Sequence, residues 1–201
     1  MNIDVVQNRT MSRKPKCIIV TGRQGSGKTT LAKKLGEQLW MPVICRDEIK
    51  EGYVNTFGTR HDELPPDTNS VVTDFFFELV DRYLAANISI VIEAAFQHHV
   101  WEPRMVNIRS RADVRIVLCS AADALTSSRP IQRGLDQPDR EFYHGDNRVV
   151  HYKKTGEILT PAHYEAPKFD VPTIKVSTDD GYDPAIETIV KNIRSDDSAF
   201  R

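Results

Sequence analysis

The stretch Cys17-Ile-Ile-Val-Thr-Gly-Arg-Gln-Gly-Ser-Gly-Lys-Thr-Thr30 decides the fold of this chain. Its first four residues are apolar and predict a short buried strand. The next part, Gly22 to Thr29, follows the pattern G-x-x-x-x-G-K-S/T of a phosphate-binding loop. Leu31, Leu35 and Leu39 then recur at a regular four-residue spacing, which predicts an amphipathic helix. Strand, glycine-rich turn and helix therefore follow one another in the order that phosphate binding requires.

The residue types of this loop suit a nucleoside triphosphate. Glycines lack a Cβ and tolerate positive φ, so the backbone can curl with its N–H groups turned inward. The N-terminus of the following helix adds unpaired N–H groups and a positive dipole end. Lys28 can reach the β- and γ-phosphates, and the Thr29 hydroxyl can ligate Mg²⁺. The expected nucleotide-binding residues are Gly22, Arg23, Gln24, Gly25, Ser26, Gly27, Lys28, Thr29 and Thr30.

Composition narrows the class of protein. The chain has 201 residues, which suits one domain, and its 27 basic and 28 acidic residues leave a net charge of -1. This balance gives no electrostatic footprint for a long nucleic acid, although it allows a local basic patch. No apolar run approaches the ~20 residues that cross a bilayer, and the N-terminus lacks the apolar core of a signal peptide. We therefore expect a cytoplasmic protein.

The cysteines and histidines do not form a metal-binding pattern. Cys17, Cys45 and Cys119 include no C-x-x-C pair, and each lies in or beside an apolar, strand-like run. We expect them to be buried thiols. Five of the six histidines are scattered without metal-ligand spacing, and we expect surface or substrate-loop positions for them. These are His98, His99, His144, His151 and His163.

Alternation of strands and helices predicts the fold class. Five apolar runs indicate strands, at residues 17–20, 41–47, 88–93, 114–119 and 172–177. Helical periodicity between them implies an α/β fold, with a mostly parallel sheet covered by helices on both faces. We expect one domain over residues 15–195, with a lid at about 121–142. The terminal segments 1–14 and 196–201 are predicted to be tails.

Some segments carry local expectations of their own. Residues 51–70 suit a loop or a broken helix, and residues 140–170 suit irregular structure, because glycines, prolines and polar residues interrupt any period. The run Phe75-Phe76-Phe77 favours a helix face packed on the sheet over an aromatic ligand platform. Asp183-Pro184 is expected to supply an N-cap and a first-turn proline for the last helix.

Two acidic residues stand at the carboxyl ends of predicted strands, where parallel α/β sheets bind ligands. Asp47 lies where the second strand ends and could take the proton of a hydroxyl that attacks a phosphate. The alternative for Asp47 is a helix N-cap. Glu93 ends the third strand and could hold Mg²⁺ directly or through water, or else cap the next segment.

Arginines gather after the fourth strand. Arg129 and Arg133 lie four residues apart, and Arg140 follows. Guanidinium groups that close over a triphosphate would neutralise the charge that develops in phosphoryl transfer. The alternative is a solvated basic face, and Pro130 argues against a regular helix between the first two arginines. We favour the lid.

Four pieces of the sequence together resemble the small phosphate-loop (P-loop) kinases. They are the phosphate loop, Cys45-Arg-Asp-Glu-Ile-Lys50, Ile90-Val-Ile-Glu-Ala94 and the arginines after Cys119. The most similar group holds polynucleotide 5′-kinases, zeta toxins, chloramphenicol phosphotransferases and AAA-family predicted kinases. The resemblance implies a three-layer P-loop NTPase fold with a five-stranded parallel sheet in the order 2-3-1-4-5. It also implies that Asp47 is the base for the attacking hydroxyl. The group usually has Asp where this chain has Glu93.

The function expected from these observations is a kinase that uses ATP and Mg²⁺ to phosphorylate a hydroxyl of a small molecule. The expected catalytic residues are Lys28, Asp47, Arg129 and Arg133, and the expected metal ligands are Thr29 and Glu93. One alternative is a 5′-hydroxyl polynucleotide kinase, which would make nucleic acid the partner. Another is an ATP-hydrolysing switch without an acceptor. The Asn-Lys-x-Asp motif that reads guanine is absent, which disfavours a GTPase.

Overall fold

The computed structural model describes residues 14–145, 147–159 and 163–195. The predicted tails, 1–14 and 196–201, lie outside these residues except for residue 14. The described chain contains a five-stranded sheet in which the strands pair only in parallel. The strands are β1 (Lys16–Gly22), β2 (Val43–Cys45), β3 (Ile90–Glu93), β4 (Asp113–Ser120) and β5 (Thr173–Ser177). Their order, β2-β3-β1-β4-β5, confirms the predicted topology.

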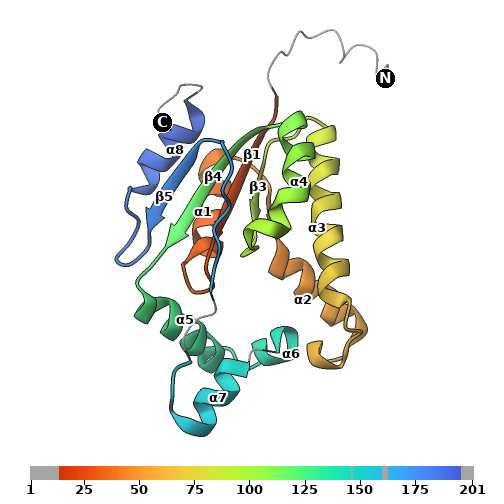
Figure 1. The fold of residues 1–201 in the computed structure, drawn as a ribbon, viewed down its shortest axis with the longest axis vertical. Coiled ribbons are helices and arrows are strands. Elements are labelled where there is room, and N and C mark those ends of the chain that lie inside the picture. The colour runs from red at the N-terminus through yellow and green to blue at the C-terminus, as the bar shows by residue number, and fades with distance from the viewer. Residues whose placement is uncertain (1–13, 146, 160–162, 196–201) are drawn as a thin grey trace.

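Helices cover both faces of this sheet and also lie beyond its carboxyl edge (Figure 1). They are α1 (Lys28–Leu39), α2 (Arg46–Phe57), the 3-10 helix η2 (His61–Glu63), α3 (Thr68–Ala85), α4 (His98–Arg111), α5 (Asp123–Asp136), α6 (Arg140–His144), α7 (Asn147–Thr155) and α8 (Ile186–Arg194). Helices α3 and α4 pack on one face, and α1 and α8 pack on the other. The fold is therefore the predicted three-layer P-loop NTPase fold. No helix of the described ranges is long and apolar enough to span a membrane.

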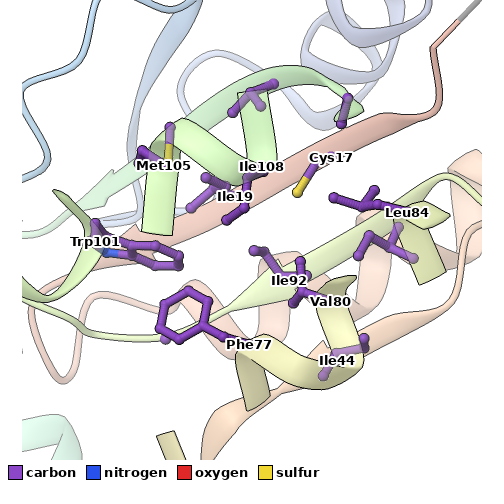
Figure 2. Packing of buried hydrophobic residues seen from close by; sticks show 14 of the residues in the cluster. Cys17, Ile19, Ile44, Phe77, Val80, Leu84, Ile92, Trp101, Met105 and Ile108 are labelled. Carbon is purple, nitrogen blue, oxygen red and sulfur yellow. The ribbon is translucent and has the colours of Figure 1, made fainter. Parts of the chain in front are cut away.

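Strand β1 lies in the middle of the sheet and contributes to both cores. Successive side chains of a strand point to opposite faces. Cys17 and Ile19 join the core under α3 and α4, part of which Figure 2 shows, whereas Ile18 and Val20 join the core under α1 and α8. All four side chains are buried. A strand covered on both sides has to be apolar at every position, which explains the continuous run that predicted it.

The phenylalanine run belongs to the core of the α3–α4 face, as predicted. Phe76 and Phe77 are buried, whereas Phe75 is exposed. The ring of Phe77 meets Trp101 of α4 edge to face, with 5.6 Å between the ring centroids. Such aromatic pairs add to the area that each ring buries. The run therefore fixes α3 on the sheet.

The three cysteines are free and buried, as the sequence predicted. Burial raises the pKa of each thiol to about 12, because the thiolate would lose its hydration. Thiols with such pKa values are poor nucleophiles at neutral pH. They are small core residues of the strands or strand ends that carry them.

Helix α5 corrects the prediction that Pro130 would interrupt the arginine-rich segment. The helix runs from residue 123 to residue 136 with Pro130 inside it. Proline cannot donate to the carbonyl four residues earlier, here that of Thr126. The Thr126 carbonyl instead lies against Gly25 of the phosphate loop. The missing hydrogen bond between residues 130 and 126 therefore lies where α5 contacts the phosphate loop. The helix continues through this position to residue 136.

Of three further local expectations, the structure contradicts two and confirms the one for residues 51–70. Residues 140–170 were expected to be irregular, but α6 and α7 lie within them. Residues 51–70 form a broken helix, because α2 continues to residue 57 and η2 follows. Asp183-Pro184 does not cap the last helix, whose N-cap is Ala185. The backbone of Asp183 instead pairs with Ser177, with N–O distances of 2.8 and 3.0 Å.

Candidate functional site

Three adjacent strands bring the predicted site residues to one edge of the sheet. Glu93, the last residue of β3, pairs with Val20 of β1 and with Cys45 of β2. The chain leaves β1 at the phosphate loop and leaves β2 at Cys45, and Asp47 follows in the first turn of α2. Both strand ends lie beside Glu93. Residues far apart in the sequence therefore meet because of the strand order.

The phosphate loop needs its glycines. Gly22, Gly25 and Gly27 have φ angles of 149°, 80° and 74°, which residues that carry a Cβ rarely adopt. A Cβ on Gly25 would also lie 2.5 Å from the Thr126 carbonyl oxygen. Gly27 is the N-cap of α1, and no side chain caps that helix. The N–H groups of the first turn of α1 are thus available to an anion, and the loop fits a phosphate chain.

We expect Gly22→Ala to destabilise the fold. A Cβ at position 22 would lie 2.3 Å from the Cys119 carbonyl oxygen, which belongs to the neighbouring strand. We expect the free energy of unfolding to fall by about 2–4 kcal/mol in urea titrations. Gly52→Ala on α2 is the matched control, because no atom lies within 4 Å of a Cβ there. A Gly22→Ala protein as stable as the wild type would contradict this steric account.

Glu93 is held by two residues at the start of α1. Lys28 Nζ lies 3.6 Å from Glu93 Oε1, and Thr29 Oγ1 donates a hydrogen bond of 2.9 Å to Glu93 Oε2. Lys28 and Glu93 are both buried, at 8% and 2% exposed. Burial raises the pKa of Glu93, while the positive charge of Lys28 opposes the shift. Glu93 does not cap the next helix, whose N-cap is Gln97.

The Thr29–Glu93 pair fits a magnesium ion. Hydroxyl and carboxylate oxygens are the hard ligands that Mg²⁺ prefers, and in nucleotide sites the ion shares them with phosphate oxygens and waters. Both oxygens lie at the N-terminus of α1, next to the glycine cradle. The donor set therefore suits an ion that accompanies a bound triphosphate.

Asp47 lies in the first turn of α2, whose N-cap is Cys45, so the alternative of a capping role is wrong. Its side chain is 53% exposed. Partial burial alone would raise the pKa of Asp47, but nearby positive charges, led by Lys28 and His144, outweigh it and lower the pKa. The carboxylate is therefore ionised at neutral pH and lies within the electrostatic field of the phosphate-loop lysine.

The two arginines of α5 differ in their contacts. Arg129 Nη1 donates to the Gly25 carbonyl oxygen over 3.3 Å and to Thr178 Oγ1 over 3.1 Å, and its Nη2 donates to the Thr178 carbonyl oxygen over 2.6 Å. It thus ties α5 to the phosphate loop and to the segment after β5. Arg133 lines a pocket over the loop together with Arg129, and it also lines the larger cavity beside Asp47.

That larger cavity, of about 450 Å³, joins the phosphate loop to Asp47. Residues of the phosphate loop and of helices α2, α5, α6 and α7 line the cavity. Figure 1 shows where these helices lie. Its charged lining includes Lys28, Asp47, Lys50, Arg133, Arg140 and His144. The sequence did not single out Lys50 or His144 as site residues. Lys50 follows Asp47 by three residues, which places both on one face of a helix. This spacing was the signal that could have identified Lys50 as a site residue.

Comparisons with known proteins find the same P-loop NTPase fold. The family model described as AAA domain matches residues 17–149. A candidate kinase from Chloroflexus aurantiacus is similar in structure, with a TM-score of 0.70 and 21% identity over 91% of this chain and 96% of that chain. The APS kinase CysC from Mycobacterium tuberculosis, solved in complex with AMPPNP and APS, has a TM-score of 0.54 and 16% identity over 91% of this chain and 99% of that chain.

A chain of the Pnkp1/Rnl/Hen1 RNA repair complex is also similar in fold. Its TM-score is 0.54 and its identity 17%, over 83% of this chain and 53% of that chain. Among curated proteins, no significant match is found. The family match spans more than half of the 201 residues and includes the phosphate loop, Asp47, Glu93 and α5. This chain is therefore a P-loop protein that belongs to the AAA domain family.

Proposed function

We propose that the protein is an ATP- and Mg²⁺-dependent kinase that transfers the γ-phosphate of ATP to a hydroxyl group of a small molecule. The observation that carries the proposal is that Lys28 and Asp47 line the same cavity. Phosphoryl transfer needs cations at the transferred group and an attacking hydroxyl in line with the leaving oxygen. A triphosphate on the loop and a hydroxyl at Asp47 would meet in this cavity.

The nucleotide half of the proposal rests on the loop and on α5. Residues 22–30 would hold the phosphates with backbone N–H groups, and Lys28 would stabilise charge on the transferred group. Arg133 lines both the loop pocket and the cavity, which supports a similar role for its guanidinium. Arg129 contacts Gly25, which supports a role in holding α5 over the loop.

Mg²⁺ would be held by Thr29 and Glu93, directly or through water, and would neutralise charge on the β- and γ-phosphate oxygens. The hydrogen bond between these two residues would orient the hydroxyl. The 2.9 Å separation of their oxygens supports this assignment. The change from the Asp usual in this group to Glu lengthens the side chain by one methylene.

The acceptor half rests on Asp47. Its low pKa keeps the carboxylate ionised, so it can accept a hydrogen bond from a substrate hydroxyl and take the proton as the oxygen attacks phosphorus. One of the positive charges that lower the pKa, the guanidinium of Arg46 on the same helix, pairs with the carboxylate over 3.5 Å between Nη1 and Oδ1. The exposed half of the side chain leaves room for an acceptor.

The role of Glu93 gives a prediction about magnesium. Glu93→Gln keeps an oxygen acceptor for Thr29 but removes the negative charge. We expect the Mg²⁺ concentration for half-maximal transfer to rise by about 10–100-fold, measured from initial rates at saturating ATP. Glu37→Gln on the exposed face of α1 is the control. An unchanged Mg²⁺ requirement in Glu93→Gln would remove Glu93 from the metal site.

The proposal is tested by γ-phosphate transfer from labelled ATP into a pool of metabolites to which a 5′-hydroxyl oligonucleotide is added. We expect label in a small molecule, identified by mass. Label in the oligonucleotide would support the polynucleotide kinase alternative. This alternative is included because a chain of an RNA repair complex has a similar fold. Label only in free phosphate, at a rate that the pool does not change, would support an ATP-hydrolysing switch.

A further inference from the structure

Lys50 is a charged side chain buried in the wall of the cavity. It is 6% exposed and lines the cavity together with Asp47. Within the described ranges its one hydrogen bond joins Nζ to His61 Nε2 over 3.2 Å, and no carboxylate forms an ion pair with it. An ammonium group carries three donors. Two of them therefore have no acceptor in the described protein, although the side chain is more than nine-tenths buried.

The surroundings of Lys50 favour a negative ligand. Arg46 lies one turn earlier on α2, and its Nη2 donates to the side chain of Asn69 over 2.9 Å. Burial, and to a smaller extent the charge of Arg46, lower the pKa of Lys50 to about 8, although the charge of Asp47 opposes both effects. Two buried or half-buried cations thus share one nearby carboxylate. An anion beside Lys50 would relieve this imbalance.

We infer that Lys50 binds an anionic group of the acceptor, so that the substrate is a small hydroxyl compound carrying a carboxylate, a phosphate ester or a sulfate. The inference rests on the proposed kinase function and adds the chemical class of its acceptor. His61, in η2, holds the ammonium in place through the 3.2 Å contact between its Nε2 and Lys50 Nζ.

The position of Lys50 on α2 limits the size of this acceptor. Residues three apart on a helix lie on one face, with about 5–6 Å between their Cβ atoms. A hydroxyl at Asp47 and an anionic group at Lys50 would therefore be only a few bonds apart. The cavity of about 450 Å³ is also of the size that small ligands occupy. Both observations favour a small acid or a small phosphorylated alcohol.

Binding of a simple anion tests the inference without catalysis. The protein is first saturated with Mg²⁺ and a non-hydrolysable ATP analogue, so that the phosphate loop is filled, and inorganic sulfate or acetate is then titrated calorimetrically. We expect Lys50→Met to bind the anion about 10–100-fold more weakly than the wild type, since a charge-assisted hydrogen bond is lost. Lys191→Met, at an exposed position of α8, is the control. Equal binding by Lys50→Met and the wild type, or no binding by either, would overturn the inference.

Fold and nucleotide binding are checked in the same samples. Methionine has nearly the length of lysine and tolerates burial, so we expect Lys50→Met to unfold at or above the wild-type temperature. Its affinity for the ATP analogue should also match the wild type. A large loss of analogue affinity would show that Lys50 contacts the nucleotide, and would overturn its assignment to the acceptor.

Paired acceptors then identify the anionic group. The pairs are gluconate with sorbitol, for a carboxylate, and glycerol 3-phosphate with glycerol, for a phosphate ester. We expect kcat/KM to favour the anionic member of one pair by at least about tenfold, and Lys50→Met to abolish that preference. Transfer to neutral members at equal rates would overturn the inference but leave the kinase standing. Failure of the ATP analogue to bind would instead overturn the proposed function.

The pH dependence of this preference is a second readout. Arg46 on α2 stays charged, Asp47 stays ionised, and His61 on η2, whose pKa burial and Lys50 lower, stays neutral above pH 7. His144 and Arg140 face the cavity from α6 and pair with Glu51. Acceptor kcat/KM should therefore fall as the pH rises through about 8, where Lys50 loses its proton. Lys50→Arg should remove this fall, and a fall that persists in Lys50→Arg would overturn the assignment to Lys50.

Discussion

Replacing Asp47 by Asn is expected to lower kcat by about 10²–10⁴-fold, the range that one general base contributes, while Mg·ATP affinity changes by less than about threefold. Asn has the shape of Asp but cannot take the hydroxyl proton. The buried partner of Lys28 is Glu93, not Asp47, so the phosphate loop should keep its arrangement. Rapid-quench single-turnover kinetics measures the transfer step, and calorimetry with a non-hydrolysable ATP analogue measures affinity.

The control for this variant is Asp180→Asn, at an exposed position in the segment after β5. It should transfer phosphate at the wild-type rate. If Asp47→Asn loses nucleotide affinity and transfer in equal measure, Asp47 is a structural or metal-linked residue. If Asp47→Asn transfers phosphate normally, the base lies elsewhere in the cavity.

Lys28→Met is expected to reduce phosphoryl transfer by about 10³-fold and to weaken nucleotide binding as well. Removal of one preorganised charge from a transition state costs about 10²–10³ in rate, and Lys28 also contacts the bound ground state in the proposed mode. The substitution also takes away the charge that opposes the rise of the pKa of Glu93. Glu93 should then protonate more readily, which adds a loss of Mg²⁺ affinity.

Lys33→Met is the matched control, because Lys33 lies on the same helix but is exposed and pairs with Glu48 on the surface. Surface pairs of this kind contribute at most about 1 kcal/mol to stability, so little should change. Both variants are compared by kcat, by affinity for the ATP analogue and by urea unfolding. Normal transfer by a folded Lys28→Met would contradict the proposed role of the phosphate loop.

The fold and the nucleotide half of the site could be predicted because their signals are local. The phosphate loop compresses strand, turn and helix start into fourteen consecutive residues, 17–30. Glu93 was identifiable because a charge at the end of a buried strand has few structural explanations. The order of the strands came from the resemblance, since periodicity alone does not order a sheet.

The acceptor half could not be predicted in the same way. A lysine three residues into a polar segment normally belongs to a solvated face, and Lys50 is buried because η2 packs beside it. His144 lies on α6, in a segment whose sequence shows no helical period, and its position depends on a 2.8 Å contact between its Nε2 and Glu51 Oε1 of α2. The prediction that Pro130 would interrupt the helix was wrong for a related reason. Contacts with the phosphate loop support α5, the helix that contains this proline. All three depend on packing between segments distant in sequence.

The most direct test of the central claim counts products in a single turnover. Enzyme in excess is mixed with Mg²⁺ and γ-labelled ATP in the presence of the acceptor pool, and ADP, free phosphate and phosphorylated acceptor are quantified together. The proposed kinase predicts one phosphorylated acceptor for each ADP, and no such product from Asp47→Asn. ADP and free phosphate in equal amounts, with no phosphorylated acceptor from the wild type, would contradict the account.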